Sequence, residues 1–292
     1  MTEINSKKIK IIECPRDAMQ GLSDFIPTEK KITYIDKLLK IGFDTIDFGS
    51  FVSPRAIPQL ADTAEVLEKL DLSVTKTKLL AIVANLRGAQ IACSHPEISY
   101  LGFPLSISET FQKLNINATI KESLGRVEDI NVVNNLCHKT GKRLVVYLSM
   151  AFGNPYGDEW SLDLISKAIE NLKNLNIEII ALSDTVGISS PELIHNMFKR
   201  FKIEFPNIEF GGHFHTTAET WLEKINAAYE AGCTRFDGAI KGYGGCPMSG
   251  YHLVGNMPTE NIITYFDKKG IELNLDNEMF NQALMEAMVV FP

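Results

Sequence analysis

The sequence predicts an α/β protein of the (β/α)8 TIM-barrel class, formed by one domain over residues 1–292 with a short C-terminal extension. Short β-branched runs alternate with longer amphipathic stretches along the whole chain, and no linker rich in Pro, Gly or Ser divides it. No G-x-G-x-x-G phosphate loop follows the first run. Eight β/α units in 292 residues fit a closed barrel better than an open doubly wound sheet.

The predicted strands are short apolar runs, several of which end in polar residues. In chain order they are Ile9–Glu13, Thr45–Phe48, Leu79–Ala84, Ile98–Phe103, Arg143–Ser149, Ile177–Ser183, Ile208–His213 and Arg235–Ile240. The stretches between them have apolar residues at helical spacing, and the clearest are Thr28–Ile41, Ser161–Leu175, Ser190–Phe201 and Thr217–Ala231. Barrel enzymes hold their chemistry at the carboxyl ends of the strands, so polar residues at these ends are the functional candidates.

The composition favours a small-molecule partner. With 29 basic and 36 acidic residues the formal charge is −7, and no basic stripe would neutralise the phosphates of a nucleic acid. No apolar run approaches the roughly 18 residues of a membrane span, and the N-terminus lacks an apolar signal core. We therefore expect a cytoplasmic protein that binds neither nucleic acid nor membrane.

We expect the five cysteines to be free thiols. They are odd in number, widely spaced and free of any C-x-x-C pair, which argues against a disulfide framework or a zinc ribbon. Four of them lie in strand or helix patterns and are interpreted as core packing: Cys14, Cys93, Cys137 and Cys233.

A histidine pair and an aspartate predict a metal site. His213 and His215 are two residues apart at the end of the seventh strand, so both rings point to the same side; the alternative is a surface or hydrogen-bonded pair. Asp17 follows the first strand, which a closed barrel places near the seventh. Asn256 is either a fourth ligand or an ordinary loop residue. Such oxygen and nitrogen donors suit Mg²⁺ or Mn²⁺, with Zn²⁺ or Co²⁺ also possible.

Two charged residues lie beside these strand ends, and each of them has both a catalytic and a structural interpretation. Arg16 is a permanent cation that could stabilise an oxyanion, or it forms a salt bridge to Glu13 or Asp47. Asp184 ends the sixth strand, where it orients a metal-bound water or a histidine, or else caps a helix.

The glycine-rich segment 242–247 after the eighth strand predicts a mobile flap, with a simple connector as the alternative. Cys246 stands in it, where an accessible thiol could donate a proton to a carbanion.

Several motifs together resemble those of the metal-dependent barrel lyases and synthases, and within them the 3-hydroxy-3-methylglutaryl-CoA lyase family. They are Pro15-Arg16-Asp17-x-x-Gln20, the segment 50–59, Asn85-Leu86-Arg87-Gly88, FQKLNIN at 111–117, the segment 183–187, His213-x-His215, Gly244-Gly245-Cys246-Pro247 and Gly255-Asn256 through Thr259-Glu260. They run in order over essentially the whole chain.

The resemblance implies retro-Claisen cleavage of 3-hydroxy-3-methylglutaryl-CoA to acetyl-CoA and acetoacetate. It places the metal on Asp17, His213, His215 and Asn256, and makes Asp17 or a metal-bound water the base. Arg16 then stabilises the enolate, Cys246 protonates it, and Asp184 completes the catalytic set. It further implies an acyl-CoA partner and a possible homodimer. The substrate contacts implied are Arg16, Gln20, Asp47, Ser53, Asn115, Tyr147 and Glu260.

The direction of reaction and the substrate have alternatives. Related synthases read Leu-Arg-Asp where this chain has Pro15-Arg16-Asp17, and many extend far beyond its last residue, so the lyase is favoured. Ala18, Asp47, Asn154 and Thr216 depart from the residues that the family usually has. These departures suggest the alternative of a related lyase, aldolase or Claisen-type synthase acting on another short hydroxyacyl-CoA or 2-oxo acid. A non-enzymatic barrel that binds metal and acyl-CoA is the third interpretation.

Overall fold

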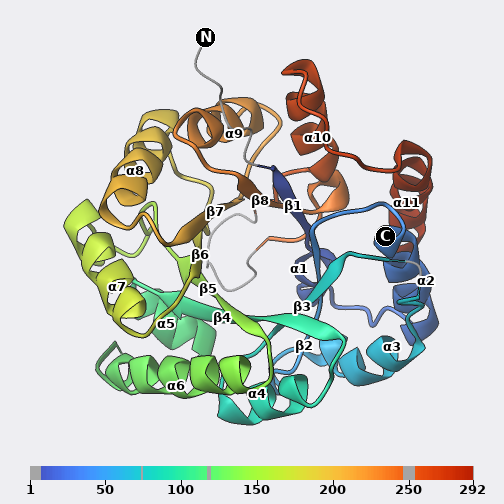
Figure 1. The fold of residues 1–292 in the computed structure, drawn as a ribbon, viewed down its shortest axis with the longest axis horizontal. Helices are drawn as coiled ribbons and strands as arrows, with labels where there is room; N and C mark the ends of the chain where they lie inside the picture. Colours follow the sequence, from blue (N-terminus) through green and yellow to red (C-terminus); the bar gives the residue numbers. More distant parts are fainter. Residues whose placement is uncertain (1–7, 74, 117–119, 246–253, 292) are drawn as a thin grey trace.

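Eight parallel strands close into a barrel in chain order, so β1 pairs with both β2 and β8 (Figure 1). The computed structural model describes residues 8–73, 75–116, 120–245 and 254–291, and side chains for all of these but 115, 116 and 120–128. The strands are β1 Lys10–Glu13, β2 Thr45–Ser50, β3 Lys78–Ile82, β4 Ile98–Ser106, β5 Arg143–Ser149, β6 Ile179–Asp184, β7 Glu209–Phe214 and β8 Arg235–Gly238. The predicted TIM barrel is confirmed.

Helices surround the barrel, and α10 and α11 follow the last strand as the C-terminal extension (Figure 1). The α-helices are α1 Pro15–Gln20, α2 Thr28–Leu39, α3 Thr63–Lys69, α4 Leu86–Cys93, α5 Glu109–Ile116, α6 Ile120–Lys139, α7 Leu162–Asn174, α8 Pro191–Glu204, α9 Trp221–Glu230, α10 Thr259–Lys268 and α11 Asn277–Val290, with 3-10 turns η1 Pro58–Leu60 and η2 Ile240–Gly242. In the described ranges, none of these helices has the length and apolarity needed to cross a bilayer.

Most predicted elements differ from the structure by a few residues at their ends, for local reasons. β8 stops at Gly238 instead of Ile240, because the chain there enters η2, where Lys241 has φ 59°. α9 begins at Trp221 instead of Thr217, because the Thr217 amide donates to Thr220 Oγ1 at 3.0 Å and closes a turn before the helix.

The barrel interior has an apolar and a polar side. Side chains from β3 to β6 form a compact cluster of Leu80, Ile82, Tyr100, Val145, Tyr147, Ile179 and Ala181. The neighbouring strands place buried polar groups nearby instead: Asp47 on β2, His213 on β7, and Arg235 and Asp237 on β8. Because β7, β8, β1 and β2 are consecutive in the closed sheet, these groups gather on one side of the interior.

Candidate active site

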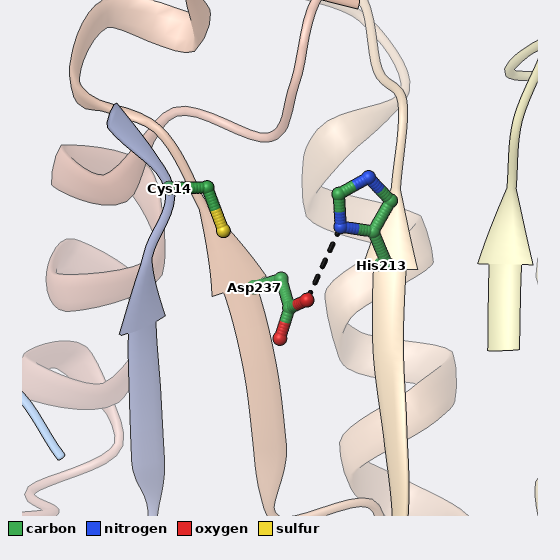
Figure 2. Close-up of side chains that lie close together, drawn as sticks. All are labelled: Cys14, His213 and Asp237. Atoms are coloured by element: carbon green, nitrogen blue, oxygen red, sulfur yellow. Dashed lines mark hydrogen bonds and ion pairs between the residues drawn. The ribbon is translucent and has the colours of Figure 1, made fainter. Parts of the chain in front are cut away.

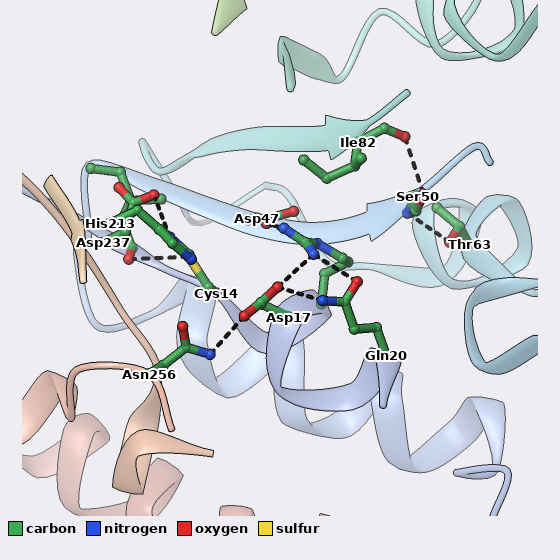
Figure 3. A network of polar contacts seen from close by, with 12 residues as sticks. Cys14, Asp17, Gln20, Asp47, Ser50, Thr63, Ile82, His213, Asp237 and Asn256 are labelled. Atoms are coloured by element: carbon green, nitrogen blue, oxygen red, sulfur yellow. Dashed lines mark hydrogen bonds and ion pairs between the residues drawn. The ribbon is translucent and has the colours of Figure 1, made fainter. Parts of the chain in front are cut away.

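A possible metal centre lies at the carboxyl ends of β7 and β1. Asp17 on α1 and the pair His213 and His215 have ligand atoms within 4.8 Å of one another, and all three residues are buried. Asn256 pairs with His215 in an isolated bridge, and its Nδ2 donates to Asp17 Oδ2 at 2.7 Å (Figure 3). The structure therefore brings the four predicted ligands together.

The protonation states of this set fit a divalent cation. Burial would raise the pKa of Asp17, but Arg16 and the two histidines lower it to about 2, so the carboxylate is ionised. Burial lowers the pKa of His215 to about 4, which keeps its ring neutral, as ligation requires. Nδ1 of His215 is buried without a hydrogen-bond partner among the described residues. An ionised carboxylate and imidazole nitrogens are a donor set suited to such an ion.

Arg16 is held by two carboxylates and an amide. Its Nε and Nη2 donate to Asp47 Oδ2 at 2.9 and 2.5 Å, and its Nη1 donates to Asp17 Oδ1 at 2.7 Å and to Gln20 Oε1 at 3.0 Å. Gln20 Nε2 also donates to Asp17 Oδ1 at 2.7 Å (Figure 3). Although burial lowers the pKa of Arg16, Asp47 and Asp17 raise it overall, so the cation persists. Of the two salt-bridge partners considered from sequence, Asp47 is the one that pairs with it.

Asp237 contacts the metal set, and sequence reasoning did not identify it. Its Oδ2 lies 3.2 Å from His213 Nδ1, with Cys14 nearby (Figure 2). Burial would lower the pKa of His213, but the bond to Asp237 raises it overall. A carboxylate on one ring nitrogen fixes the orientation of the ring and leaves Nε2 for a metal. One feature of the sequence could have identified it. Arg235 and Asp237 are two residues apart on a predicted strand, so both charged side chains point to the same face of the sheet.

The described hydrogen bonds of Asp184 do not involve the rings of His213 and His215. Its Oδ2 accepts from Lys224 Nζ at 2.6 Å and from Ser189 Oγ at 2.5 Å, and none of its described hydrogen bonds reaches either ring. Lys224 Nζ also donates to the His215 carbonyl at 3.1 Å, so Asp184 is connected to the site through this buried lysine. The alternative of a helix cap is wrong, because α8 begins seven residues later with Ser190 as its N-cap.

The other predicted substrate contacts are dispersed. The Tyr147 ring meets His213 edge-on, with centroids 5.8 Å apart. Ser53 is exposed, and its Oγ accepts from the Arg55 amide at 3.3 Å. Glu260 on α10 accepts from the Lys241 amide at 3.0 Å. Two predicted residues cannot be placed: the Asn115 side chain and Cys246 lie outside the described residues.

The glycine-rich segment passes close to the first turn of α1. At Gly244, where φ is 91°, a Cβ would lie 2.6 Å from the Asp17 carbonyl oxygen and 2.9 Å from Asn256 Nδ2. Only glycine allows this approach without a shift of the backbone. Asn256 Nδ2 also donates to the Tyr243 carbonyl at 2.9 Å, so the segment is tied directly to a candidate ligand.

The chain is similar to known proteins over most of its length. The model of the HMGL-like family matches residues 8–287. The chain is similar to hydroxymethylglutaryl-CoA lyase YngG of Bacillus subtilis, at 34% identity over 93% of this chain and 89% of that protein. It is also similar to the cytoplasmic 3-hydroxy-3-methylglutaryl-CoA lyase of Rattus norvegicus, at 33% identity over 92% of this chain and 77% of that protein.

Solved structures with the same fold are also similar to this chain. The Bacillus subtilis HMG-CoA lyase superposes with a TM-score of 0.88 at 33% identity, over 96% of this chain and 92% of that chain. The structure of an HMG-CoA lyase from Acinetobacter baumannii, in complex with coenzyme A and 3-methylmalate, superposes with a TM-score of 0.87 at 30% identity. The match covers 97% of this chain and 91% of that chain.

Proposed function

Because this chain belongs to the HMGL-like family, we propose that it is a carbon–carbon lyase that cleaves 3-hydroxy-3-methylglutaryl-CoA to acetyl-CoA and acetoacetate. The observation that carries this proposal is the buried set of Asp17, His213 and His215, with Arg16 bonded to Asp17. The lyase is favoured over a related enzyme with another substrate, because the relatives named above are HMG-CoA lyases.

Asp17, His213 and His215 would hold the cation, with the Asn256 amide oxygen as a further ligand. Mixed oxygen and nitrogen donors make Mg²⁺ or Mn²⁺ the ion that we propose, with Zn²⁺ or Co²⁺ as the alternatives. The bound ion supplies Lewis-acid polarisation of the tertiary hydroxyl of the substrate, which lowers the pKa of that hydroxyl.

The reaction moves one electron pair onto the acetyl fragment. The tertiary hydroxyl gives its proton to a base, which is a water molecule or Asp17. The bond from its carbon to the thioester CH₂ then breaks, and the ketone of acetoacetate forms. The electron pair of the broken bond becomes the enolate of acetyl-CoA, and a proton on its carbon completes the product. We assign stabilisation of the enolate oxygen to Arg16, because the Asp47 and Asp17 carboxylates hold it in place before the reaction.

Two proton-transfer roles follow from the local chemistry. For the base we propose a water molecule or Asp17, whose carboxylate is ionised and lies beside both histidines. For the proton donor we propose Cys246. In its support, Gly244, two residues earlier in the sequence, packs against Asp17. The cytoplasmic location and the homodimer remain predictions from the sequence.

An assay of acetoacetate tests the proposed function. Metal-free protein is incubated with 3-hydroxy-3-methylglutaryl-CoA, alone or with Mg²⁺ or Mn²⁺, beside a panel of other short hydroxyacyl-CoA thioesters and 2-oxo acids. We expect acetoacetate only when the divalent ion is present, and the highest kcat/KM for 3-hydroxy-3-methylglutaryl-CoA. No product with any divalent ion would overturn the proposal, and a preferred second substrate would support the alternative enzyme.

A further inference from the structure

A second set of possible ligands lies beside the first and shares one histidine with it. Cys14 Sγ, a His213 ring nitrogen and an Asp237 carboxylate oxygen all lie within 4.8 Å of one another, and the three residues are buried (Figure 2). The 3.2 Å between His213 Nδ1 and Asp237 Oδ2 is close to the edge of a tetrahedron of donors about 2.0 Å from a central ion. The spacing therefore suits a small tetrahedral cation.

Unpaired polar atoms surround this set. Asp237 Oδ1 and the Tyr147 hydroxyl are buried without a hydrogen-bond partner in the described part of the chain, and the two residues are 2% and 6% exposed. Within the described residues, the hydrogen bond of Cys14 Sγ is a long contact of 3.6 Å to the Ile12 carbonyl. A buried polar atom without a partner is costly, so these groups favour the presence of a ligand.

The electrostatic environment of the sulfur also favours a cation. The carboxylates of Asp237, Asp47 and Asp17 are all close enough to interact with the Cys14 thiol, and Arg16 is the opposing charge. These negative charges would stabilise a positive ion next to the sulfur.

We propose that Cys14, His213 and Asp237 bind a thiophilic divalent cation of the Zn²⁺ class, beside the cation site of Asp17, His213 and His215. Thiolate, imidazole and carboxylate are the ligands that zinc takes in proteins, whereas a thiolate is a poor ligand for Mg²⁺. His213 would present Nδ1 to the thiophilic ion and Nε2 to the other. Binding displaces the thiol proton and the proton shared between Nδ1 and Oδ2, and no electron is transferred.

Sharing His213 would connect the two sites. A thiophilic ion on Nδ1 replaces the proton that orients the ring, and it adds a positive charge close to the first cation. Excess Zn²⁺ should therefore inhibit an enzyme already saturated with Mg²⁺. The binding itself does not depend on the lyase reaction, so the experiment below measures no turnover.

Cd²⁺ titration tests the site, because a cadmium–thiolate bond gives an ultraviolet charge-transfer absorption. Every sample holds saturating Mg²⁺ and carries Cys246→Ser, which removes that thiol from the measurement. We expect this parent protein to bind one Cd²⁺ with the thiolate absorption, and Cys14→Ala to lose it. Cys233→Ala is the matched control, since Cys233 is equally buried but belongs to neither set of candidate ligands, and it should behave as the parent.

Asp237→Asn gives the second measurement, and circular dichroism checks the fold of each variant. The isosteric change should weaken Cd²⁺ binding by at least ~10-fold, because orienting and ligating carboxylates typically contribute that much. The proposal is overturned if the parent shows no thiolate absorption, or if Cys14→Ala retains it. If Cys14→Ala fails to fold, the test rests on Asp237→Asn. A Cd²⁺ affinity of this variant equal to that of the parent would then contradict the site.

Discussion

Two buried carboxylates near the end of β1 differ in their pKa by several units. Glu13 has its pKa raised by burial to about 8, whereas Asp17 titrates at about 2. Glu13 accepts from the Ile240 amide at 2.9 Å and from Thr259 Oγ1 at 2.5 Å, and no cation is among its described hydrogen-bond partners. Burial acts on both groups, so the difference comes from the cation Arg16 and the two histidines around Asp17.

The difference separates a structural carboxylate from a functional one. Glu13 ties β1 to the start of η2 and to the first residue of α10, the two ends of the chain segment that contains the glycine-rich loop. Asp17 instead keeps a charge inside the barrel, where it faces His213 and His215. Burial alone therefore does not identify the functional carboxylate. The nitrogen groups around Asp17 do, and Glu13 has none of them among its described hydrogen-bond partners.

The largest expected effect is that of Asp17→Asn, which keeps the shape of the side chain and removes its charge. Loss of the cation removes several kcal/mol of transition-state stabilisation, so kcat/KM for acetoacetate formation should fall at least ~10³-fold. Glu13→Gln is the matched change at the other carboxylate and should leave kcat/KM within about threefold. The described hydrogen bonds of the Glu13 side chain go to Ile240 and Thr259 and to none of the residues proposed to hold the catalytic cation. Equal losses in the two variants would contradict the comparison.

Asp237→Asn tests the carboxylate that orients a ligand. The variant retains an oxygen that can accept from His213 Nδ1 but loses the charge, so Mn²⁺ affinity should fall by roughly 10 to 100-fold. Equilibrium dialysis with Mn²⁺ measures this affinity, with Asp163→Asn, an exposed surface change, as the control. An affinity equal to that of the wild type would remove Asp237 from the site.

A smaller effect is expected from Asp47→Asn. Arg16 would lose the charge of the partner that accepts from its Nε and Nη2 but would keep Asp17. We therefore expect kcat/KM to fall about tenfold, in line with the loss of charge assistance from hydrogen bonds that persist. Steady-state kinetics at saturating Mg²⁺ separate this change from a loss of metal. A fall as large as that of Asp17→Asn would show that Asp47 does more than hold the arginine.

Glu13→Gln should change the pH dependence of stability rather than catalysis. Its folded-state pKa of about 8 lies above the ordinary value of 4.5, so the native state holds the proton more tightly. Its contribution is therefore complete below pH 4.5 and is lost as pH rises toward 8, with a slope of at most about 1.4 kcal/mol per pH unit. Urea unfolding from pH 5 to 8 should show a flatter profile for the variant, and parallel profiles would contradict this.

The sequence was sufficient to predict the fold and the shared orientation of His213 and His215, because both follow regular patterns. Short β-branched runs give the eight strands, and the period of two places His213 and His215 on one side. The Cys14–His213–Asp237 set was missed because it depends on register: β1 and β8 pair with Ile12 opposite Asp237, which no local pattern reveals. The bond from Lys224 to Asp184 likewise joins a helix to a strand end through tertiary packing alone.

Mn²⁺ binding to three proteins tests the central claim that the ionised carboxylate, and not the merely buried one, forms the metal centre. Wild type, Glu13→Gln and Asp17→Asn are dialysed against Mn²⁺, and the bound ion is counted per chain. We predict one bound ion in wild type and in Glu13→Gln, and none in Asp17→Asn. Full binding by Asp17→Asn, or loss of binding by a folded Glu13→Gln, would contradict the account.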